Sequence, residues 1–169
     1  MVKLRYISWA EYGRLSAELV EMLRESPRFD LVIGIARGGI PLAMVVSDQL
    51  DVRLDIINVK SYGGIAEREK PRIVSTLTES VTGKKVLLVD DLVDEGETMR
   101  TVTSHLRRQK PRLVKTGVLF KKPWTKFSPD FYLETLEEWI VFPWERGEVA
   151  RILEEQKRAK SKTRGRVEN

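Results

Sequence analysis

The stretch VLLVDDLVDEGETM, residues 86–99, decides the expected fold and much of the expected chemistry. It opens with four apolar residues, a pattern typical of a strand that is buried on both faces of a sheet. Two carboxylates follow at Asp90 and Asp91, then a turn that contains Gly96, and then the helical pattern of residues 99–108. The stretch therefore predicts a strand, an acidic pair, a tight turn and the beginning of a helix.

This order of elements suits a bound anion, because the first turn of a helix presents unpaired N–H groups and the positive end of its dipole. Gly96 allows the backbone to approach the anion closely, and Thr98 adds a hydroxyl donor. The acidic pair would lie at the carboxyl end of the strand, where ligands bind in open α/β sheets. Two carboxylates there suit ribose hydroxyls or a hydrated Mg²⁺. The alternative is a structural turn whose acidic residues only cap the helix, but the strand–turn–helix context favours a ligand site.

The same stretch resembles the phosphoribosyl-pyrophosphate motif of type I phosphoribosyltransferases. That motif is an apolar strand, two acids, two apolar residues, Asp, Thr, Gly, any residue and Thr. Glu95 stands where the family usually has the first Thr, and Glu97 adds another carboxylate. Two carboxylates beside a phosphate repel it unless both point outward. The resemblance implies that the backbone of residues 94–98 holds the 5′-phosphate and that Asp90 and Asp91 hold the ribose hydroxyls, directly or through Mg²⁺.

Length and composition indicate one globular domain. The 169 residues are enough for a substantial core. No run of eighteen apolar residues is present, so no transmembrane helix is predicted, and the N-terminal segment does not resemble a secretory signal. The absence of cysteine excludes disulfides, thiolate metal sites and a thiol nucleophile. We expect a cytoplasmic protein without membrane association.

The net charge is +5 at pH 7, and residues 156–169 are rich in lysine and arginine. A basic patch can bind nucleic acid, but we interpret this segment as a solvated, frayed terminus and do not expect a nucleic-acid partner. We therefore predict a single domain over residues 1–155 and a basic tail over 156–169. Within the domain, the core would span about 29–120, and a hood with the base-binding segment would comprise about 121–145 plus the N-terminal segment.

A second strand–turn–helix unit comes earlier in the chain. Residues 29–36 predict a strand, Arg37-Gly38-Gly39 a turn, and the apolar residues from Ile40 a helix. The arginine and the open glycine backbone could bind another anion, although a glycine turn with a solvated arginine explains the unit equally well. In the family that the chain resembles, the equivalent loop binds pyrophosphate and often contains a strained peptide bond.

Four more segments have recognisable sequence patterns. Residues 53–60 predict a strand, and the polar stretch from Ser61 to about Ser80 is long enough to be a functional or disordered loop. The resemblance implies that this loop is a flexible hood that closes over the active site and excludes water. Residues 113–120 predict a further strand, and residues 138–143 a short strand that ends at Pro143.

The segment from 120 to 145 resembles the purine-binding end of bacterial xanthine-guanine phosphoribosyltransferases. It has a Lys-Pro pair, then Trp-Ile about fifteen residues later, then Pro-Trp and an acid. The resemblance implies that Lys122 donates a hydrogen bond to the exocyclic oxygen at purine C6. It also implies that Trp139 stacks on the base and that the backbone around Ile140 reads the edge of the base.

We therefore predict an α/β protein with the type I phosphoribosyltransferase fold: a mainly parallel, twisted sheet flanked by helices, with a small hood. The expected activity is 6-oxopurine phosphoribosyl transfer from phosphoribosyl pyrophosphate to N9 of hypoxanthine, guanine or xanthine. Asp94 would be the general base, Mg²⁺ the cofactor with Asp90 and Asp91 as ligands, and the assembly a homodimer or homotetramer. The predicted phosphoribosyl pyrophosphate site consists of Arg37, Gly38, Gly39, Asp90, Asp91, Asp94, Glu95, Gly96, Glu97 and Thr98.

Two other functions stay open at this point. The fold is also used by regulators that bind phosphoribosyl pyrophosphate and nucleic acid without catalysis, and the basic tail and Glu95 fit that function. Asp94, the hood and Lys122 argue against it, because a sensor needs neither a base nor a lid. A phosphoribosyltransferase for another nucleobase is the third possibility. Lys122 disfavours adenine, because an ammonium group has only donors and adenine carries an amino group at C6.

Overall fold

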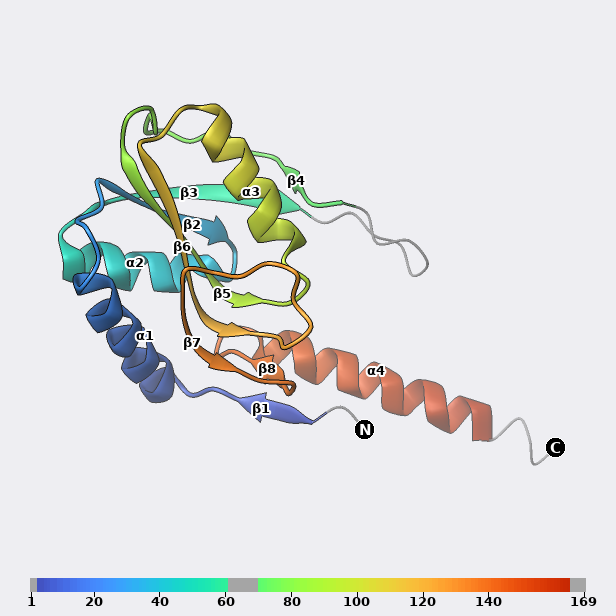
Figure 1. Ribbon diagram of the computed structural model, residues 1–169. Coiled ribbons are helices and arrows are strands. Elements are labelled where there is room, and N and C mark those ends of the chain that lie inside the picture. The colour runs from blue at the N-terminus through green and yellow to red at the C-terminus, as the bar shows by residue number, and fades with distance from the viewer. Residues whose placement is uncertain (1–2, 61–69, 165–169) are drawn as a thin grey trace. The chain divides into compact units, whose positions relative to one another are not determined.

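The computed structural model describes residues 3–60 and 70–164, with side chains described as far as residue 155. The chain forms two compact units, one made of Arg14–Glu137 and the other of Met1–Gly13 together with Glu138–Asn169. Figure 1 labels their helices and strands. Among the described residues, no helix is long and apolar enough to cross a membrane.

The larger unit is built on one six-stranded sheet with the strand order β4-β3-β2-β5-β6-β7. All neighbouring strands pair in parallel except β3 and β4, which are antiparallel. The strands are β2 (Leu31–Ala36), β3 (Arg53–Lys60), β4 (Arg72–Ile73), β5 (Lys85–Val93), β6 (Leu113–Lys121) and β7 (Phe131–Thr135). This arrangement confirms the predicted α/β fold with a mainly parallel sheet.

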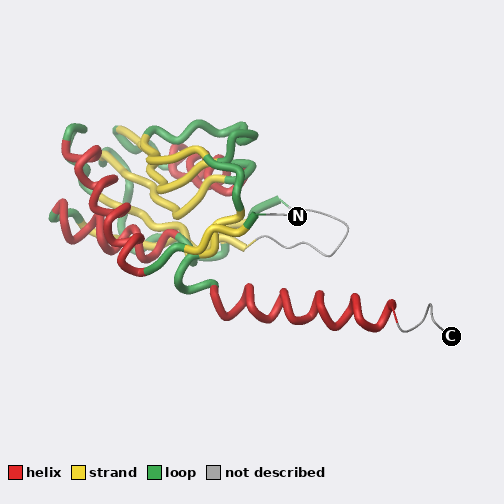
Figure 2. Tube along the Cα trace, turned by 90° about the horizontal axis from the view of Figure 1, so that it is seen from below, coloured by secondary structure: helices red, strands yellow, loops and turns green. Residues whose placement is uncertain are grey.

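Helices cover both faces of this sheet. The chain passes from β2 through α2 (Gly39–Leu50) to β3 on one side, and from β5 through α3 (Glu97–Arg108) to β6 on the other. Because such crossovers are right-handed, two crossovers that run in opposite directions from the sheet centre place their helices on opposite faces. Figure 2 shows the strands in yellow and the helices in red. The central strands β2 and β5 are accordingly buried along most of their length.

The smaller unit contains a two-stranded parallel sheet of β1 (Leu4–Tyr6) and β8 (Trp139–Val141), and the helix α4 (Arg146–Arg164). An aromatic cluster stabilises it. The rings of Phe142 and Trp144 stack with their centroids 5.0 Å apart, and Tyr12 meets Trp144 edge-on at 5.0 Å. This unit joins the N-terminal segment to the segment that follows residue 137. The helix α1 (Trp9–Arg24) begins in the smaller unit and continues into the larger one.

Several details differ from the sequence expectations. The apolar run predicts a strand that ends before the acidic pair, but β5 continues through Asp90 and Asp91 to Val93, because β6 pairs with it as far as Val93 and Lys121. The sequence patterns predict none of β1, β4, β7 and α4. The last of these extends to Arg164, so residues 156–164 are helical rather than frayed. The division into a domain over 1–155 and a tail stays a prediction.

The predicted hood loop lies partly outside the described residues, which exclude 61–69. The rest of it follows the edge of the sheet. Ser75 accepts a hydrogen bond from the backbone of Asn58 at 2.8 Å, and the backbone of Val74 donates to the Asn58 carbonyl at 2.9 Å. The segment that follows the undescribed residues is therefore held to the end of β3.

A buried carboxylate fixes the far end of this segment. Asp55, which is 7% exposed on β3, accepts hydrogen bonds from the backbone of Ile56, from the backbone and hydroxyl of Thr78, and from the backbone of Glu79, at 2.7–3.1 Å. Asp55→Asn should lower the free energy of unfolding by about 1–3 kcal/mol, because an amide cannot accept all of these bonds. Urea unfolding would measure this, with the exposed Asp48→Asn as the control. Equal midpoints for the two variants would contradict the assigned role.

Candidate active site

Two glycine-containing loops follow the two central strands of the sheet. Residues 37–39 follow β2, and residues 94–98 follow β5. These two strands are neighbours and pair in parallel from Leu31 with Val86 to Gly34 with Val89, so both loops leave the same edge of the sheet. The connections after them run in opposite directions, which makes this edge a topological switch point, the usual ligand site of open α/β sheets.

The first loop lies directly against the acidic pair. A Cβ atom at Gly38 would overlap the carboxylate of Asp91, and one at Gly39 would come within 2.6 Å of the Val89 carbonyl oxygen and 3.2 Å of Asp90 Oδ1. Only glycine fits such a close approach. The peptide bond between Ala36 and Arg37, just before these two glycines, is cis. The structure thus brings together the residues predicted for pyrophosphate and those predicted for the ribose.

Burial, and then the charge of the adjacent carboxylate, determine the electrostatics of the acidic pair. Burial raises the pKa of the Asp90 carboxyl well above its ordinary value, and the charge of Asp91 raises it further. A hydrogen bond from the Asp91 backbone to Asp90 Oδ1, at 3.0 Å, opposes this shift. The pair therefore favours a compensating partner such as a cation or hydroxyl donors.

The acidic pair suits a divalent cation that is shared with a bound phosphate rather than enclosed by protein side chains. Within the described ranges, no group of three or more His, Cys, Asp or Glu side chains is arranged to hold a metal. Mg²⁺ is usually bound by one or two carboxylates, with phosphate oxygens and water completing its shell. Asp90 and Asp91 supply that number of carboxylates beside the glycines of the first loop.

The raised pKa of Asp90 predicts how stability depends on pH. The folded protein binds this proton more tightly than the unfolded chain does, so the free energy of unfolding should fall as the pH rises from about 4 toward the raised pKa. Asp90→Asn removes the carboxyl group whose ionisation destabilises the folded protein. In metal-free buffer at pH 7, this variant should therefore unfold at a higher temperature than the wild type. Thermal unfolding across this pH range measures the difference, which should shrink toward pH 4. An unchanged pH dependence in the variant would contradict the assignment.

The second loop ends at the beginning of α3. Gly96 adopts the left-handed conformation with φ 88° and ψ 5° immediately before the helix, a conformation that favours glycine. A Cβ atom there would overlap the Cβ of Phe127 and lie 3.1 Å from Thr125 Oγ1. The N-cap residue is Gly96 itself, so no side-chain hydrogen bond from the N-cap caps this end of the helix. The first N–H groups of α3 therefore suit a phosphate.

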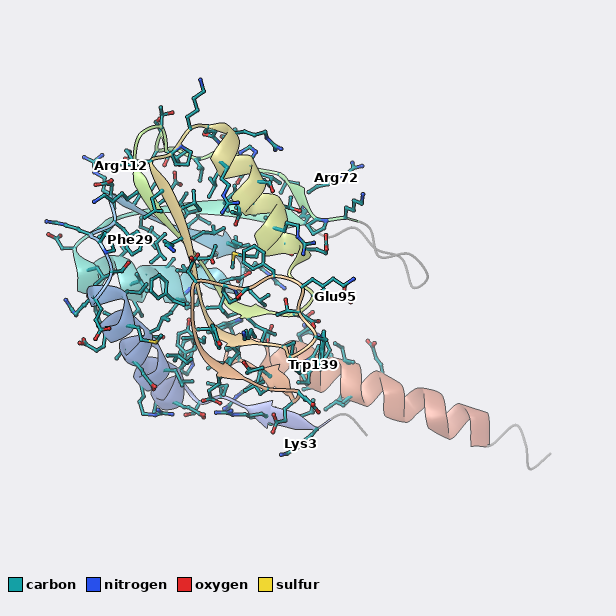
Figure 3. The ribbon with its side chains drawn as sticks, viewed as in Figure 1. Lys3, Phe29, Arg72, Glu95, Arg112 and Trp139 are labelled. Atoms are coloured by element: carbon teal, nitrogen blue, oxygen red, sulfur yellow. The ribbon has the colours of Figure 1, made fainter. Side chains whose placement is uncertain are left out.

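The two glutamates of this loop are exposed. Glu97 forms an ion pair with Arg100 one turn later in α3, and Arg100 also donates to the Lys126 carbonyl at 3.4 Å. The charge of Glu97 is therefore compensated locally, which reduces its repulsion of a phosphate. Glu95 accepts a backbone hydrogen bond from Lys126 at 3.4 Å through its carbonyl, and Figure 3 shows it beside the beginning of α3.

A segment that the sequence analysis did not assign to the phosphate site runs beside this loop. We call residues 122–127, which follow β6, the strap. Its backbone donates from Lys122 to the Val93 carbonyl at 2.9 Å, besides the bond from Lys126 to Glu95. The exposed Asp94 accepts a hydrogen bond from the indole N–H of Trp124 at 2.7 Å. No periodicity or spacing in the sequence indicates this contact.

The residues predicted to bind the purine belong to both units. Lys122, in the larger unit, is 5% exposed. Its Nζ donates to the Glu137 carbonyl at 3.4 Å and lies 5.6 Å from the ring centroid of Trp124. Trp139, which is 57% exposed, and the buried Ile140 lie on β8 of the smaller unit. Their joint action with Lys122 stays a prediction.

The strap also lines a pocket of about 320 Å³ in the larger unit. Three of the side chains around it are the lysines at 121, 122 and 126, and Thr125, Ser128 and Thr135 add hydroxyl groups. Positive charge and hydroxyl donors together suit a ligand rich in oxygen acceptors.

Comparison with known proteins agrees with this geometry. A profile of the phosphoribosyl transferase domain matches residues 8–151. The xanthine-guanine phosphoribosyltransferase of Idiomarina loihiensis is 31% identical over 142 residues, covering 83% of this chain and 86% of that protein. The xanthine-guanine phosphoribosyltransferase of Cereibacter sphaeroides is 34% identical over 149 residues, with the same two coverages.

Solved structures show the same likeness. The purine phosphoribosyltransferase of Pyrococcus horikoshii is 37% identical, with a TM-score of 0.77 over 84% of this chain and 93% of that chain. The xanthine-guanine-hypoxanthine phosphoribosyltransferase of Helicobacter pylori is 27% identical, with a TM-score of 0.72 over 84% of this chain and 94% of that chain. The chain belongs to the phosphoribosyltransferase family. The resemblance drawn from residues 86–99 and 120–145 is thereby confirmed.

Proposed function

We propose that this protein is a 6-oxopurine phosphoribosyltransferase of purine salvage, which forms a nucleoside monophosphate from phosphoribosyl pyrophosphate and a purine base. The observation that carries the proposal is the contact of the Arg37–Gly39 loop with Asp90 and Asp91 at the switch point of the sheet. In this proposal the open backbone of the loop binds pyrophosphate, and the carboxylates beside it hold the ribose hydroxyls. The xanthine-guanine phosphoribosyltransferases among the relatives support a 6-oxopurine as the acceptor.

The proposed chemistry needs placement and charge rather than a nucleophile. Loss of pyrophosphate from C1 of the ribose leaves a centre that resembles an oxocarbenium ion, and N9 of the purine attacks it with inversion. Arg37 and the N–H groups of Gly38 and Gly39 bind the departing pyrophosphate. Asp90 and Asp91 hold the ribose hydroxyls and lie close to the positive charge that develops. When bound, Mg²⁺ supplies charge neutralisation for the pyrophosphate.

The remaining residues orient the base and the phosphate. The backbone of residues 94–98 holds the 5′-phosphate at the beginning of α3. Asp94 accepts the proton from N7 of the purine as N9 attacks, which is the task of a general base at hydrogen-bond distance. Lys122 donates to the oxygen at C6, Trp139 stacks on the ring and the backbone of Ile140 reads its edge. We further propose a cytoplasmic homodimer or homotetramer without a nucleic-acid partner.

The direct test measures pyrophosphate release from phosphoribosyl pyrophosphate with each of hypoxanthine, guanine, xanthine, adenine and uracil. Release should require a 6-oxopurine and Mg²⁺, and a chelator should abolish it. The matching nucleoside monophosphate should accumulate in equal amount. Binding of phosphoribosyl pyrophosphate without turnover on any base would support the regulator instead. Preference for adenine or uracil would overturn the acceptor class.

The close approach at Gly38 predicts a specific loss of substrate binding. Gly38→Ala places a methyl group on the Asp91 carboxylate, so the loop or the carboxylate must move. We expect KM for phosphoribosyl pyrophosphate to rise roughly tenfold or more, which corresponds to about 1.4 kcal/mol. Gly13→Ala is the matched control, because a Cβ atom there has open space within 4 Å. Equal KM values for the two variants would remove Gly38 from the site.

A further inference from the structure

The hydrogen bond between Trp124 and Asp94 has no part in the chemistry described so far. It joins the indole Nε1 to Asp94 Oδ1 at 2.7 Å, which is short for an N–H···O bond and typical of a charged acceptor. Trp124 is 52% exposed, so burial of its ring does not explain its position. An aromatic side chain that is half open to solvent is instead held by one polar contact with a site residue.

The backbone places Trp124 in register with Asp94. Hydrogen bonds from Lys122 to Val93 and from Lys126 to Glu95 flank the pair on either side. A turn with a hydrogen bond from Thr125 to the Lys122 carbonyl, at 3.2 Å, presents Trp124 at its corner. The strap therefore runs beside residues 94–98, which we call the phosphate loop, and the indole N–H faces the carboxylate.

We propose that Trp124 is a positioning residue for Asp94 in phosphoribosyl transfer. An exposed aspartate on a loop can rotate about two side-chain bonds, and a general base must face its proton at hydrogen-bond distance. The indole occupies Oδ1 and leaves Oδ2 for the N–H of the purine. This inference rests on the proposed function, because only that function gives Asp94 a proton to accept.

The ring of Trp124 also lies close to Lys122, the residue proposed to bind the C6 oxygen of the purine. Its centroid lies 5.6 Å from Nζ of Lys122, within the range in which a cation is attracted to an aromatic face. One side chain thus contacts both the residue proposed to take the N7 proton and the residue proposed to donate to the C6 oxygen. Trp124 fixes the spacing of these two groups along the edge of the purine.

The test is Trp124→Phe, which keeps an aromatic ring and removes the N–H. We expect kcat with hypoxanthine or guanine to fall about tenfold, the scale of one lost hydrogen bond to a charged group. KM for phosphoribosyl pyrophosphate and its calorimetric affinity should stay within about twofold, because the phosphate loop is unchanged. Trp9→Phe is the matched control, since Trp9 is an exposed tryptophan of the smaller unit, and its kcat should equal that of the wild type.

A double variant shows whether Trp124 acts through Asp94. In an Asp94→Asn background, Trp124→Phe should cause little further loss of kcat. A further tenfold loss would overturn the inference, because Trp124 would then act elsewhere. So would an unchanged kcat in the single variant, or a lower KM for the purine with kcat kept, which would mean that the indole competes with the base. An inactive wild type would instead refute the proposed function, and the two failures are thereby distinguished.

Discussion

Asp94→Asn should lower the turnover number by about a hundredfold or more while the affinity for phosphoribosyl pyrophosphate stays close to that of the wild type. The size is the usual contribution of a general base. Asparagine has the same shape, and its Oδ1 can still accept the hydrogen bond from Trp124 that the structure shows. What it cannot do is take the proton from N7 of the purine. The loss should therefore appear in kcat and leave ground-state binding nearly intact.

Two measurements separate these quantities. Steady-state pyrophosphate release gives kcat, and isothermal calorimetry with phosphoribosyl pyrophosphate and Mg²⁺ gives the affinity. Asp48→Asn makes the same chemical change at an exposed position on α2 and should match the wild type in both. Turnover of Asp94→Asn at the wild-type rate would remove Asp94 from the mechanism. A parallel collapse of affinity would make it a binding residue.

The central strands were predictable from the sequence because a strand that is buried on both faces has an almost continuous run of apolar residues. Leu31–Ala36 and Lys85–Val93 carry apolar runs that β2 and β5 then bury. Shorter elements lack that signal. The strand β7 (Phe131–Thr135) has one partner and intermediate burial along most of its length, so its pattern is neither apolar throughout nor strictly alternating. Its existence depends on the edge that β6 offers.

The site was predictable to the extent that it is local in sequence. The acidic pair, Gly96 and the first loop each stand within one strand–turn–helix unit, and the parallel pairing of β2 with β5 brings the two units together. The contact of Trp124 with Asp94 joins residues thirty positions apart. It depends on where the strap runs after β6, which no periodicity or spacing specifies. The compensation of Glu97 by Arg100 lies within one helical turn and could have been foreseen from their spacing.

Selectivity for the base gives the second large expected effect, because Lys122 and Trp139 would perform separable tasks. Trp139 is 57% exposed and offers a flat π surface, and stacking on an aromatic side chain is worth roughly 1–3 kcal/mol with little regard to the base. Trp139→Ala should therefore lower kcat/KM for hypoxanthine, guanine and xanthine by similar factors, roughly five- to 150-fold. Discrimination between these bases and adenine should remain.

Lys122 should behave differently, because it would read the identity of the base. Its side chain is buried, and the ammonium donates to the Glu137 carbonyl at 3.4 Å. Lys122→Met keeps most of the side-chain length and removes the donor together with its positive charge. The oxygen at C6 is then left without its partner, and a lost hydrogen bond to a charged group costs about 1.5–3 kcal/mol. We expect kcat/KM for each 6-oxopurine to fall about ten- to 150-fold, and adenine to lose much less.

The decisive quantity is the ratio of kcat/KM for hypoxanthine to that for adenine in the wild type and both variants. It should stay within about threefold of wild type in Trp139→Ala and fall at least tenfold in Lys122→Met, since each 1.36 kcal/mol is a factor of ten. Trp9→Phe again serves as the control for an exposed tryptophan. Suppose that Lys122→Met keeps the full discrimination against adenine. Lys122 would then not read the base, and the 6-oxopurine assignment would rest on Trp139 and the backbone of Ile140 alone.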